Sequence, residues 1–419
     1  MRVWIQNGWV IDPASGINSI ADIVIENGKI ADIKYPGKEP DGEVLVDARG
    51  LIVAPGLVDM HCHLREPGQT HKEDIASGTK SAAKGGFTSI ACMPNTTPPL
   101  DTPELIAQVK NAPASVHVHP FGTITRGMKG DEMSNLAALK EAGAVGVSDD
   151  GLPVASAKMM HDTLLEAKKH GLTVTSHCEE PTMKHGVIHD GIAAKRLGVQ
   201  GISPAAEECM VAREIVLASV TDSPVHIAHI STRGSVELIR DAKARGLNVT
   251  AETCPHYFSL TDEVCMSRNA NTKMNPPLRT ADDVRAIIEG LKDGTIDAIA
   301  TDHAPHHADE KGKGFSAAPN GIIGFETALA VAITYLVKPG HLSMLEMLRK
   351  FTQNPGEILG IPAGKMVEGA PADFVLFDPM EAWEVKAEEI VSKSKNTPYL
   401  GYRLYGKVRY TVVDGKIVE

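Results

Sequence analysis

The sequence has few cysteines, and they form no pattern. Six cysteines stand among 419 residues, and no Cys-x-x-Cys pair occurs. A disulfide framework or a cysteine-based zinc site would need such spacing, so neither is indicated. The sequence also lacks an uncharged apolar run of about 18 residues, which excludes a membrane-spanning helix. The start of the chain, Met1–Trp4, alternates like a strand and has no signal-peptide core, so we expect a cytoplasmic protein.

An excess of basic residues is missing as well. Lys and Arg number 42 against 53 Asp and Glu, which gives a formal net charge of −11. Nucleic acids and anionic membranes are bound through basic surfaces, so this balance argues against both kinds of partner. The hydrophobic fraction of 42% is high enough for a large core, which excludes a disordered or fibrous chain.

The two ends of the chain are rich in short strands. Residues 23–30 form a predicted hairpin whose Asn27-Gly28 pair supplies the positive φ of a two-residue turn. Residues 410–418 repeat this pattern around Asp414-Gly415, and Ala372–Phe377 is a further strand-like run. Because chain termini often lie close together, we expect residues 1–55 and 365–419 to form one composite β-rich domain.

Between these ends, residues 56–364 alternate between short apolar runs and helical stretches. The helical patterns include Pro103–Lys110, Asn135–Ala142, Ala157–His170 and Glu207–Val220. The eight apolar runs are Leu57–His63, Phe87–Met93, Val116–Thr123, Ala144–Asp150, Leu172–His177, Val225–Ile230, Leu247–Cys254 and Ile296–Asp302. Eight strand–helix alternations over about 300 residues predict an α/β fold, a (β/α)8 TIM-type barrel whose active site forms at the C-terminal strand ends.

Potential metal ligands follow several of these runs. His61 and His63 share a strand face because side chains alternate, and either Asp149 or Asp150 ends the fourth run. His177, His229 and Asp302 end three further runs. Four imidazoles and two carboxylates at one barrel mouth suit a pair of divalent ions, and the nitrogen-rich set favours zinc.

Other candidates carry less weight. His117 and His119 repeat the His-x-His pattern on the third run, but they add nothing that the first set lacks. Cys62, between the two proposed ligands, should point to the opposite strand face and pack there. Strand alternation directs only one of Asp149 and Asp150 inward, and spacing alone leaves that choice open.

Four short motifs stand out in the region of the predicted barrel. They are Asp59-Met-His-Cys-His-Leu-Arg-Glu-Pro-Gly68, Met93-Pro-Asn-Thr96, Asn275-Pro-Pro-Leu-Arg279 and Thr301-Asp-His-Ala-Pro-His306. These motifs resemble those of the dihydroorotases, within the metal-dependent amidohydrolase superfamily, and the similarity runs from Asp59 to about Asn354. The β-rich ends match the small composite domain of this superfamily.

The resemblance implies a set of site residues. The metal ligands would be His61, His63, Asp150, His177, His229 and Asp302, holding two zinc ions per subunit, with Asp150 rather than Asp149 bridging them. Many related enzymes use a carbamylated lysine as the bridge, but Ala144–Asp150 contains no lysine, as in the bacterial branch that uses aspartate. The substrate contacts would be Arg65, Asn95, Asn275 and His306.

The implied reaction is the reversible cyclisation of N-carbamoyl-L-aspartate to (S)-dihydroorotate, a step of de novo pyrimidine biosynthesis. Asp302 is the expected proton shuttle. Arg65 is expected to grip the carboxylate that substrate and product share, rather than to form a surface ion pair with Glu66. Two zinc ions and Arg65 outweigh two aspartates and a hydroxide, so an acidic protein can still hold an anionic substrate.

The sequence also allows two alternative functions. An allantoinase or a dihydropyrimidinase would keep the metals and change the ring, and a catalytically silent subunit would act as a scaffold for aspartate transcarbamoylase. As partners, the resemblance implies further copies of the chain and a complex with aspartate transcarbamoylase. The charged, glycine-rich residues 306–320 would form either a lid over the site or an ordinary exposed loop.

Overall fold

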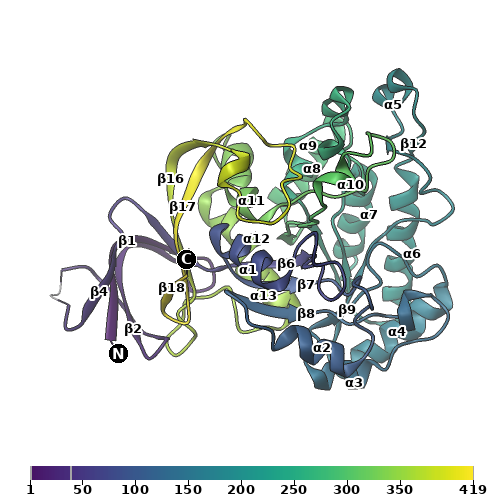
Figure 1. The fold of residues 1–419 in the computed structure, drawn as a ribbon. Coiled ribbons are helices and arrows are strands. Elements are labelled where there is room, and N and C mark those ends of the chain that lie inside the picture. The colour runs from purple at the N-terminus through teal and green to yellow at the C-terminus, as the bar shows by residue number, and fades with distance from the viewer. Residues whose placement is uncertain (1, 38–39, 419) are drawn as a thin grey trace.

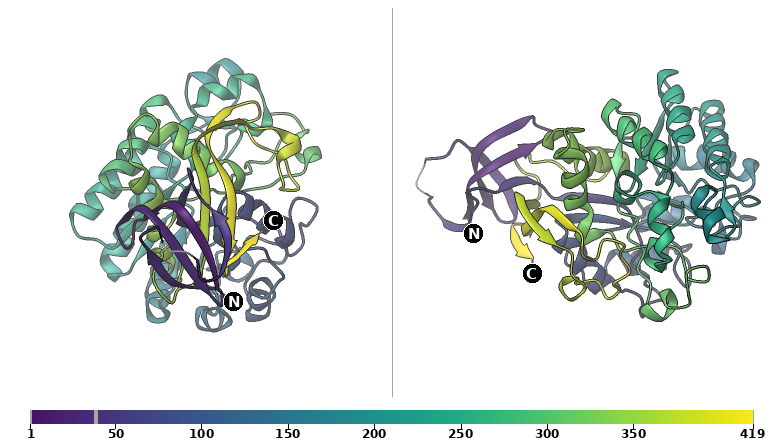
Figure 2. Two further views of the ribbon diagram at one scale, coloured as in Figure 1. Left: turned by 90° about the vertical axis from the view of Figure 1, so that its left-hand side faces the viewer. Right: turned by 90° about the horizontal axis from the view of Figure 1, so that it is seen from above.

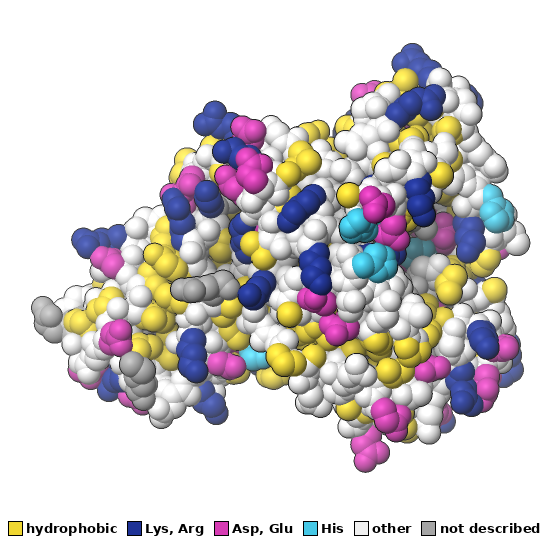
Figure 3. Space-filling view, in the orientation of Figure 1, with side chains coloured by type: hydrophobic (Ala, Val, Ile, Leu, Met, Phe, Trp, Pro, Cys, Tyr) yellow, Lys and Arg dark blue, Asp and Glu magenta, His cyan; other side chains and the backbone are white. Residues whose placement is uncertain are grey.

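A computed structural model describes residues 2–37 and 40–418 of the chain. It consists of a β-sheet part, which contains both ends of the chain, and a larger part rich in helices (Figures 1 and 2). Among the described residues, no helix is long and apolar enough to cross a membrane. On the face drawn in Figure 3, acidic and basic side chains are interspersed over both parts, so that face carries no large basic patch.

The smaller part is built around one eight-stranded sheet with members from both chain ends. Its order is β18-β17-β16-β5-β1-β2-β3, and β4 pairs with β1. The strands are β1 (Arg2–Asp12), β2 (Ile17–Glu26), β3 (Lys29–Lys34), β4 (Glu43–Asp47), β5 (Ile52–Pro55), β16 (Phe374–Glu384), β17 (Arg403–Val413) and β18 (Lys416–Val418). The antiparallel pair β5–β16 joins the two ends, with Phe374 opposite Pro55. This pairing supports the domain boundaries after residues 55 and 364, which stay a prediction.

Both hairpins form where the sequence predicts them. Asn27 and Gly28 have φ values of 51° and 76° between the antiparallel strands β2 and β3. Asp414 and Gly415 have φ values of 49° and 75° between β17 and β18. Two consecutive left-handed residues make the tight turn that matches the twist of a two-stranded ribbon, which explains the Asn-Gly and Asp-Gly pairs.

The larger part is a closed parallel barrel, as the eight apolar runs predict. Its strands are β6 (Leu57–Cys62), β7 (Phe87–Cys92), β8 (His117–Pro120), β9 (Gly146–Val147), β10 (Thr173–Ser176), β13 (Val225–Ile227), β14 (Val249–Thr253) and β15 (Ala298–Ile299). They form the sheets β6-β7-β8 and β15-β14-β13-β10-β9. Parallel bridges from Cys62 to His303 and from Gly122 to Val147 join the edges of the two sheets and close the ring.

Helices surround this ring (Figure 1). The longer ones are α1 (Ile75–Lys84), α2 (Pro103–Lys110), α3 (Leu136–Ala142), α4 (Ala157–His170), α6 (Ala205–Thr221), α7 (Arg233–Ala244), α9 (Ala281–Asp293), α11 (Phe325–Ala332), α12 (Met344–Phe351) and α13 (Gln353–Leu359). Shorter elements are α5 (Ile192–Leu197), α8 (Pro255–Ser259), α10 (Ala308–Lys311), β11 (Ile188–His189) and β12 (Gly201–Ile202). The predicted helices over 103–110 and 157–170 have these same bounds, because Thr102 and Ser156 cap their first turns.

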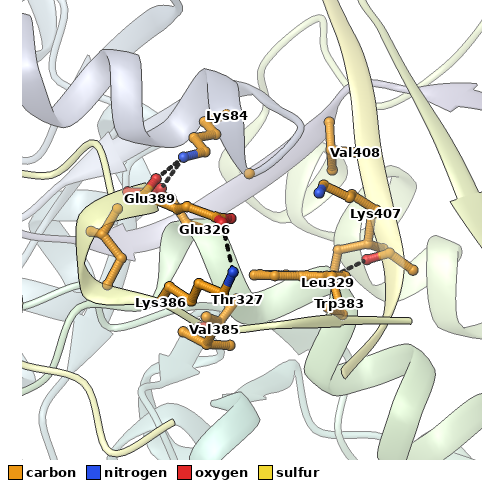
Figure 4. A pocket seen from close by; sticks show the side chains of 14 residues that line it. Lys84, Glu326, Thr327, Leu329, Trp383, Val385, Lys386, Glu389, Lys407 and Val408 are labelled. Carbon is orange, nitrogen blue, oxygen red and sulfur yellow. Dashed lines mark hydrogen bonds and ion pairs between the residues drawn. The ribbon is translucent and has the colours of Figure 1, made fainter. Parts of the chain in front are cut away.

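A small cavity lies where the sheet part meets the barrel (Figure 4). Its volume is about 70 Å³, and α1, α11, β16 and β17 contribute to its walls. Lys84 Nζ lies 3.3 Å from Glu326 Oε2 at its rim, and the Trp383 indole N–H donates to the Gly406 carbonyl at 3.0 Å. The described residues that line this cavity include none of the predicted metal or substrate residues. It is therefore separate from the predicted active site.

The barrel core depends on aromatic packing beneath α11 and α12. The Phe87 ring is fully buried and lies 5.6 Å from the Phe325 ring and 6.3 Å from the Phe351 ring, measured between centroids. We expect Phe87→Ala to lower the free energy of unfolding by about 3–5 kcal/mol, because it leaves a cavity among these rings. The urea midpoint of the purified protein measures this. Ile20→Ala is the control, since Ile20 is 52% exposed, and equal midpoints for both variants would contradict the expectation.

Candidate metal centre and active site

The predicted metal ligands all lie at the C-terminal end of barrel strands. His61 belongs to β6, and the other five follow their strands within three residues: His63, Asp150, His177, His229 and Asp302. All six are buried. Because the carboxyl ends of parallel strands meet at one edge of the barrel, His63 and Asp302 come together here although they are 239 positions apart in the chain.

Asp150 stands at the centre of this cluster. Its Oδ1 lies 3.3 Å from His61 Nε2, 3.4 Å from His177 Nδ1 and 3.8 Å from His229 Nε2. Its Oδ2 lies 3.6 Å from His63 Nε2. Two possible three-residue metal sites result, one with His61 and His63 and one with His177 and His229, and Asp150 belongs to both.

Asp302 completes the cluster on the side of the first pair. Its Oδ1 lies 3.1 Å from His63 Nε2 and 3.9 Å from His61 Nε2. Both contacts use the same carboxylate oxygen. Asp302 therefore adjoins the site formed with His61 and His63.

Several donor atoms of the cluster lack the hydrogen-bond partners that buried polar atoms need, as expected for metal ligands. His61 Nε2 and Asp150 Oδ1 are buried, and among the described residues neither has a hydrogen-bond partner. Buried polar atoms normally have partners, so these two indicate a ligand. His177 Nδ1 and His229 Nε2 face each other at 2.8 Å, where a shared cation would satisfy both lone pairs. Four imidazoles and two carboxylates are a donor set typical of zinc.

The charge of Asp150 agrees with a role as a ligand. Burial alone would raise the pKa of its carboxyl, but the imidazoles of His61, His177 and His229 outweigh burial and hold that pKa well below its usual value. The carboxylate is therefore ionised, which is the form that binds a cation.

The structure separates Asp150 from its neighbour Asp149. Asp149 Oδ1 accepts from the backbone N–H groups of Ile124 and Thr125, at 2.8 and 3.1 Å, and the Thr125 hydroxyl donates to Oδ2. Asp149 thus fastens the loop after β8 and does not belong to the cluster. Cys62 packs in the core with its thiol on the Ala91 carbonyl, on the far side of the strand.

His117 lies outside the cluster too. Its Nε2 is 3.0 Å from Asp373 Oδ2, so it forms an ion pair between the barrel and the smaller sheet when protonated. Burial, together with the charge of His117, lowers the pKa of the neighbouring His119 to about 4. Neither histidine approaches the six predicted ligands.

Arg65 is a buried cation beside the metal cluster. Its Nε donates to the Pro305 carbonyl at 3.1 Å, and its Nη2 lies 3.4 Å from His306 Nε2. Glu66, the alternative partner, instead accepts the backbone N–H of Ile75 at the start of α1. Among the described residues, no carboxylate forms an ion pair with Arg65 within 4.0 Å, which leaves its guanidinium free for an anionic ligand.

The other predicted substrate contacts divide into two kinds. Asn95 interacts with the ligands themselves, since its Oδ1 is 2.9 Å from His63 Nδ1 and its Nδ2 donates to Asp150 Oδ2 at 3.2 Å. Asn275 Oδ1 is buried and has no hydrogen-bond partner among the described residues, so it is available to a ligand. His306 Nε2 is 2.8 Å from the Asn320 carbonyl, and burial, with the charge of Arg65, lowers the His306 pKa to about 3.

Three of these residues have backbone conformations that residues other than glycine rarely adopt. The φ values are 61° at Arg65, 31° at His229 and 46° at Asp302. Left-handed backbone costs energy in such residues and persists only where the surrounding structure enforces it, as it does at functional sites. The loops after β6, β13 and β15 are therefore held in the shapes that aim these side chains.

Residues 306–320 lie at the barrel mouth and include α10. Lys311 is buried, and its ammonium donates to the carbonyls of Ala270 and Pro319 at 3.1 and 2.9 Å. Lys273 Nζ likewise donates to the carbonyls of Ser316 and Ala318. Two lysines thus tie this segment to the loop after α8, and its action as a lid stays a prediction.

Comparisons with known proteins agree with this geometry. Residues 50–235 match a family model described as dihydro-orotase-like. A dihydroorotase of Geobacter metallireducens is 52% identical over 100% of this chain and 99% of its own length. A dihydroorotase of Acetivibrio thermocellus is 51% identical over 99% of this chain and 98% of its own.

The chain belongs to the dihydroorotase family. It is thus a cyclic amidohydrolase, as its sequence motifs predict. Solved structures show the same fold: the dihydropyrimidinase of Brevibacillus agri superposes with a TM-score of 0.88 at 25% identity, covering 100% of this chain and 95% of that one. The L-hydantoinase of Arthrobacter aurescens gives 0.89 at 26% identity, over 99% and 95%.

Two carboxylates of this dihydroorotase-family site are not among the residues predicted from the sequence. Glu252, in β14, is fully buried, and its Oε1 accepts from His61 Nδ1 at 2.7 Å. Its Oε2 lies 3.3 Å from His226 Nε2. Glu179 Oε2 lies 3.5 Å from His177 Nε2. A charged residue inside the apolar run Leu247–Cys254 is the signal that identifies Glu252, because such a residue needs a buried partner.

Glu252 fixes the orientation of His61. Its carboxylate holds the proton on His61 Nδ1, so the lone pair on Nε2 points toward Asp150. Burial would raise the pKa of Glu252, but His61 and His226 lower it to about 2, and the carboxylate stays ionised. Carboxylate–histidine pairs of this kind raise the basicity of an imidazole ligand toward a metal.

We expect Glu252→Gln to weaken metal binding by about 10- to 100-fold, because a neutral amide orients His61 less firmly. The measurement is the zinc retained after dialysis against graded concentrations of a chelator. Glu207→Gln is the matched control, since Glu207 is also a buried, hydrogen-bonded glutamate but accepts from Ser231, Thr232 and Ser235. Equal metal retention by both variants would show that Glu252 does not support His61.

Proposed function

We propose that this protein is a dihydroorotase, which reversibly cyclises N-carbamoyl-L-aspartate to (S)-dihydroorotate in de novo pyrimidine biosynthesis. The observation that carries the proposal is the buried Arg65 guanidinium beside a cluster of six potential metal ligands. A buried cation without a carboxylate partner matches a substrate that brings its own carboxylate. Full-length relatives about half identical to this chain bear the name dihydroorotase, which supports the same reaction.

The proposed cofactor is a pair of zinc ions per subunit. His61, His63 and Asp302 would hold one ion, His177 and His229 the other, and Asp150 would bridge them. The two three-residue groups that share Asp150 support this assignment. When bound, such ions lower the pKa of a water molecule and polarise a carbonyl.

The side chains around the cluster have separate proposed roles. Arg65 binds the substrate carboxylate, with Asn275 and His306 as further contacts at the mouth. Asn95 orients His63 and Asp150 by its two hydrogen bonds, in addition to the substrate contact expected from its motif. Asp302 shuttles the proton between the attacking water and the ring nitrogen; its contacts with His61 and His63 use Oδ1, which leaves Oδ2 for that proton.

Two alternatives are less well supported. A dihydropyrimidinase or allantoinase acts on a ring without a carboxylate and has no use for Arg65, although the fold is shared. A silent scaffold for aspartate transcarbamoylase has no need to keep six converging ligands. Assembly of this chain into a homo-oligomer, and its association with aspartate transcarbamoylase, stay predictions of the family resemblance.

The direct test is turnover. We expect the purified protein to interconvert carbamoyl aspartate and dihydroorotate, to leave allantoin and dihydrouracil unchanged, and to lose activity with a chelator and regain it with zinc. Spectrophotometric assays in both directions, with a metal count on the same sample, measure this. Turnover of dihydrouracil in place of dihydroorotate would move the protein to the dihydropyrimidinases.

Arg65→Lys tests the carboxylate contact. A lysine offers one point charge where the guanidinium offers a planar pair of donors, so kcat/KM for dihydroorotate should fall about 10- to 100-fold. Metal content should stay at the wild-type value, because Arg65 is no ligand. The control is Arg240→Lys on α7, where the arginine side chain is 43% exposed, and a kcat/KM for Arg65→Lys near that of this control would refute the assignment.

A further inference from the structure

The chain between β16 and β17 leaves the smaller sheet and runs over the barrel (Figure 1). We call residues 390–397 of this chain the strap. Its side chains alternate, with Ser392, Ser394 and Asn396 buried and Lys393 and Lys395 exposed. One face of the strap is therefore packed against the barrel along its length.

The strap is anchored before it reaches the active site. The backbone N–H of Val391 donates to Glu326 on α11 at 2.9 Å. The Ser392 hydroxyl donates to the buried Glu73 carboxylate, and the Ser394 hydroxyl donates to the Lys72 carbonyl at 2.8 Å. These contacts bind the strap to α11 and to the loop before α1.

Asn396 then enters the loop that follows β15. Its Oδ1 accepts from the His306 backbone N–H at 3.1 Å, and its Nδ2 donates to the carbonyls of Ala304 and Gly321, at 3.0 and 3.1 Å. Its own carbonyl accepts from the Ile323 N–H at 3.0 Å. The side chain is 3% exposed, and its donors and its acceptor all have partners.

Two proposed substrate contacts depend on this loop. His306 is part of it, and Arg65 Nε donates to the carbonyl of Pro305. Pro305 lies between Ala304 and His306, which are both hydrogen-bonded to the Asn396 side chain. Arg65 also has a left-handed backbone conformation. Because that conformation is strained, contacts such as its hydrogen bond to Pro305 are needed to hold the residue in position. A shift of about 1 Å in a positioning element can cost about 100-fold in rate.

We infer that Asn396, from outside the predicted barrel domain, is a positioning residue for the reaction. It holds residues 304–306 and 321–323 together and thereby sets where Arg65 and His306 meet the substrate. The inference rests on the proposed function, since it assumes that these two residues bind the substrate. Through the strap, the predicted composite domain would contribute to the geometry of the active site.

The test compares Asn396→Ala with Ser394→Ala, which removes an anchor of the same strap but no contact to the loop after β15. We expect Asn396→Ala to raise the KM for dihydroorotate at least about 10-fold, with zinc content as in the wild type, while Ser394→Ala keeps a near-normal KM. Asn396→Asp should behave like the alanine variant, because it sets a carboxylate against two carbonyls. Equal KM values for Asn396→Ala and Ser394→Ala would overturn the inference.

A measurement on the wild type covers variants that fail to fold. Hydrogen–deuterium exchange should slow in residues 303–323 and in the strap together when dihydroorotate is added. Protection confined to 303–323 would overturn the inference, even though dihydroorotate still turns over. If the wild type does not turn over dihydroorotate, the proposed function fails, and the inference fails with it.

Discussion

The arrangement around the Asp150 carboxylate is the constraint on which the rest of this site depends. A buried carboxylate is costly unless cations or hydrogen bonds compensate it, and here imidazoles from the ends of three barrel strands converge on it. Only a closed barrel brings the ends of β6, β9, β10 and β13 to one point. The fold therefore positions the candidate ligands, and a bound cation would compensate the burial of their charges.

A layer of further contacts fixes three of the four imidazoles. Glu252 holds His61, Asn95 holds His63, and Glu179 lies against His177. Each contact uses the ring nitrogen that faces away from the centre of the cluster. This layer determines which nitrogen carries the proton and so makes the inner nitrogens available together. Glu252 comes from β14 and Asn95 from the loop after β7, neither of which carries a ligand, whereas Glu179 follows His177 in the loop after β10.

The sequence predicts the fold and the convergence of the candidate ligands, because both rest on local patterns. Eight apolar runs give eight strands, and turn pairs such as Asn27-Gly28 mark the hairpins. The outer layer is harder to predict, because Glu252 reaches His61 across 191 residues and no spacing encodes that contact. Asn396 is hidden for the same reason, since nothing in residues 390–397 resembles a site until the chain is folded.

The fold alone does not decide the substrate. Enzymes that are a quarter identical to this chain share its barrel and sheet and bear the names dihydropyrimidinase and hydantoinase. Metal chemistry opens a cyclic amide in either ring, so the discrimination must lie in the groups that meet the ring substituents. A buried, unpaired guanidinium rejects a substrate without a carboxylate, because the charge would then stay both desolvated and uncompensated. In the proposed function, Arg65, the Pro305 carbonyl and the loop that holds them would therefore make a common hydrolytic centre selective for an acid.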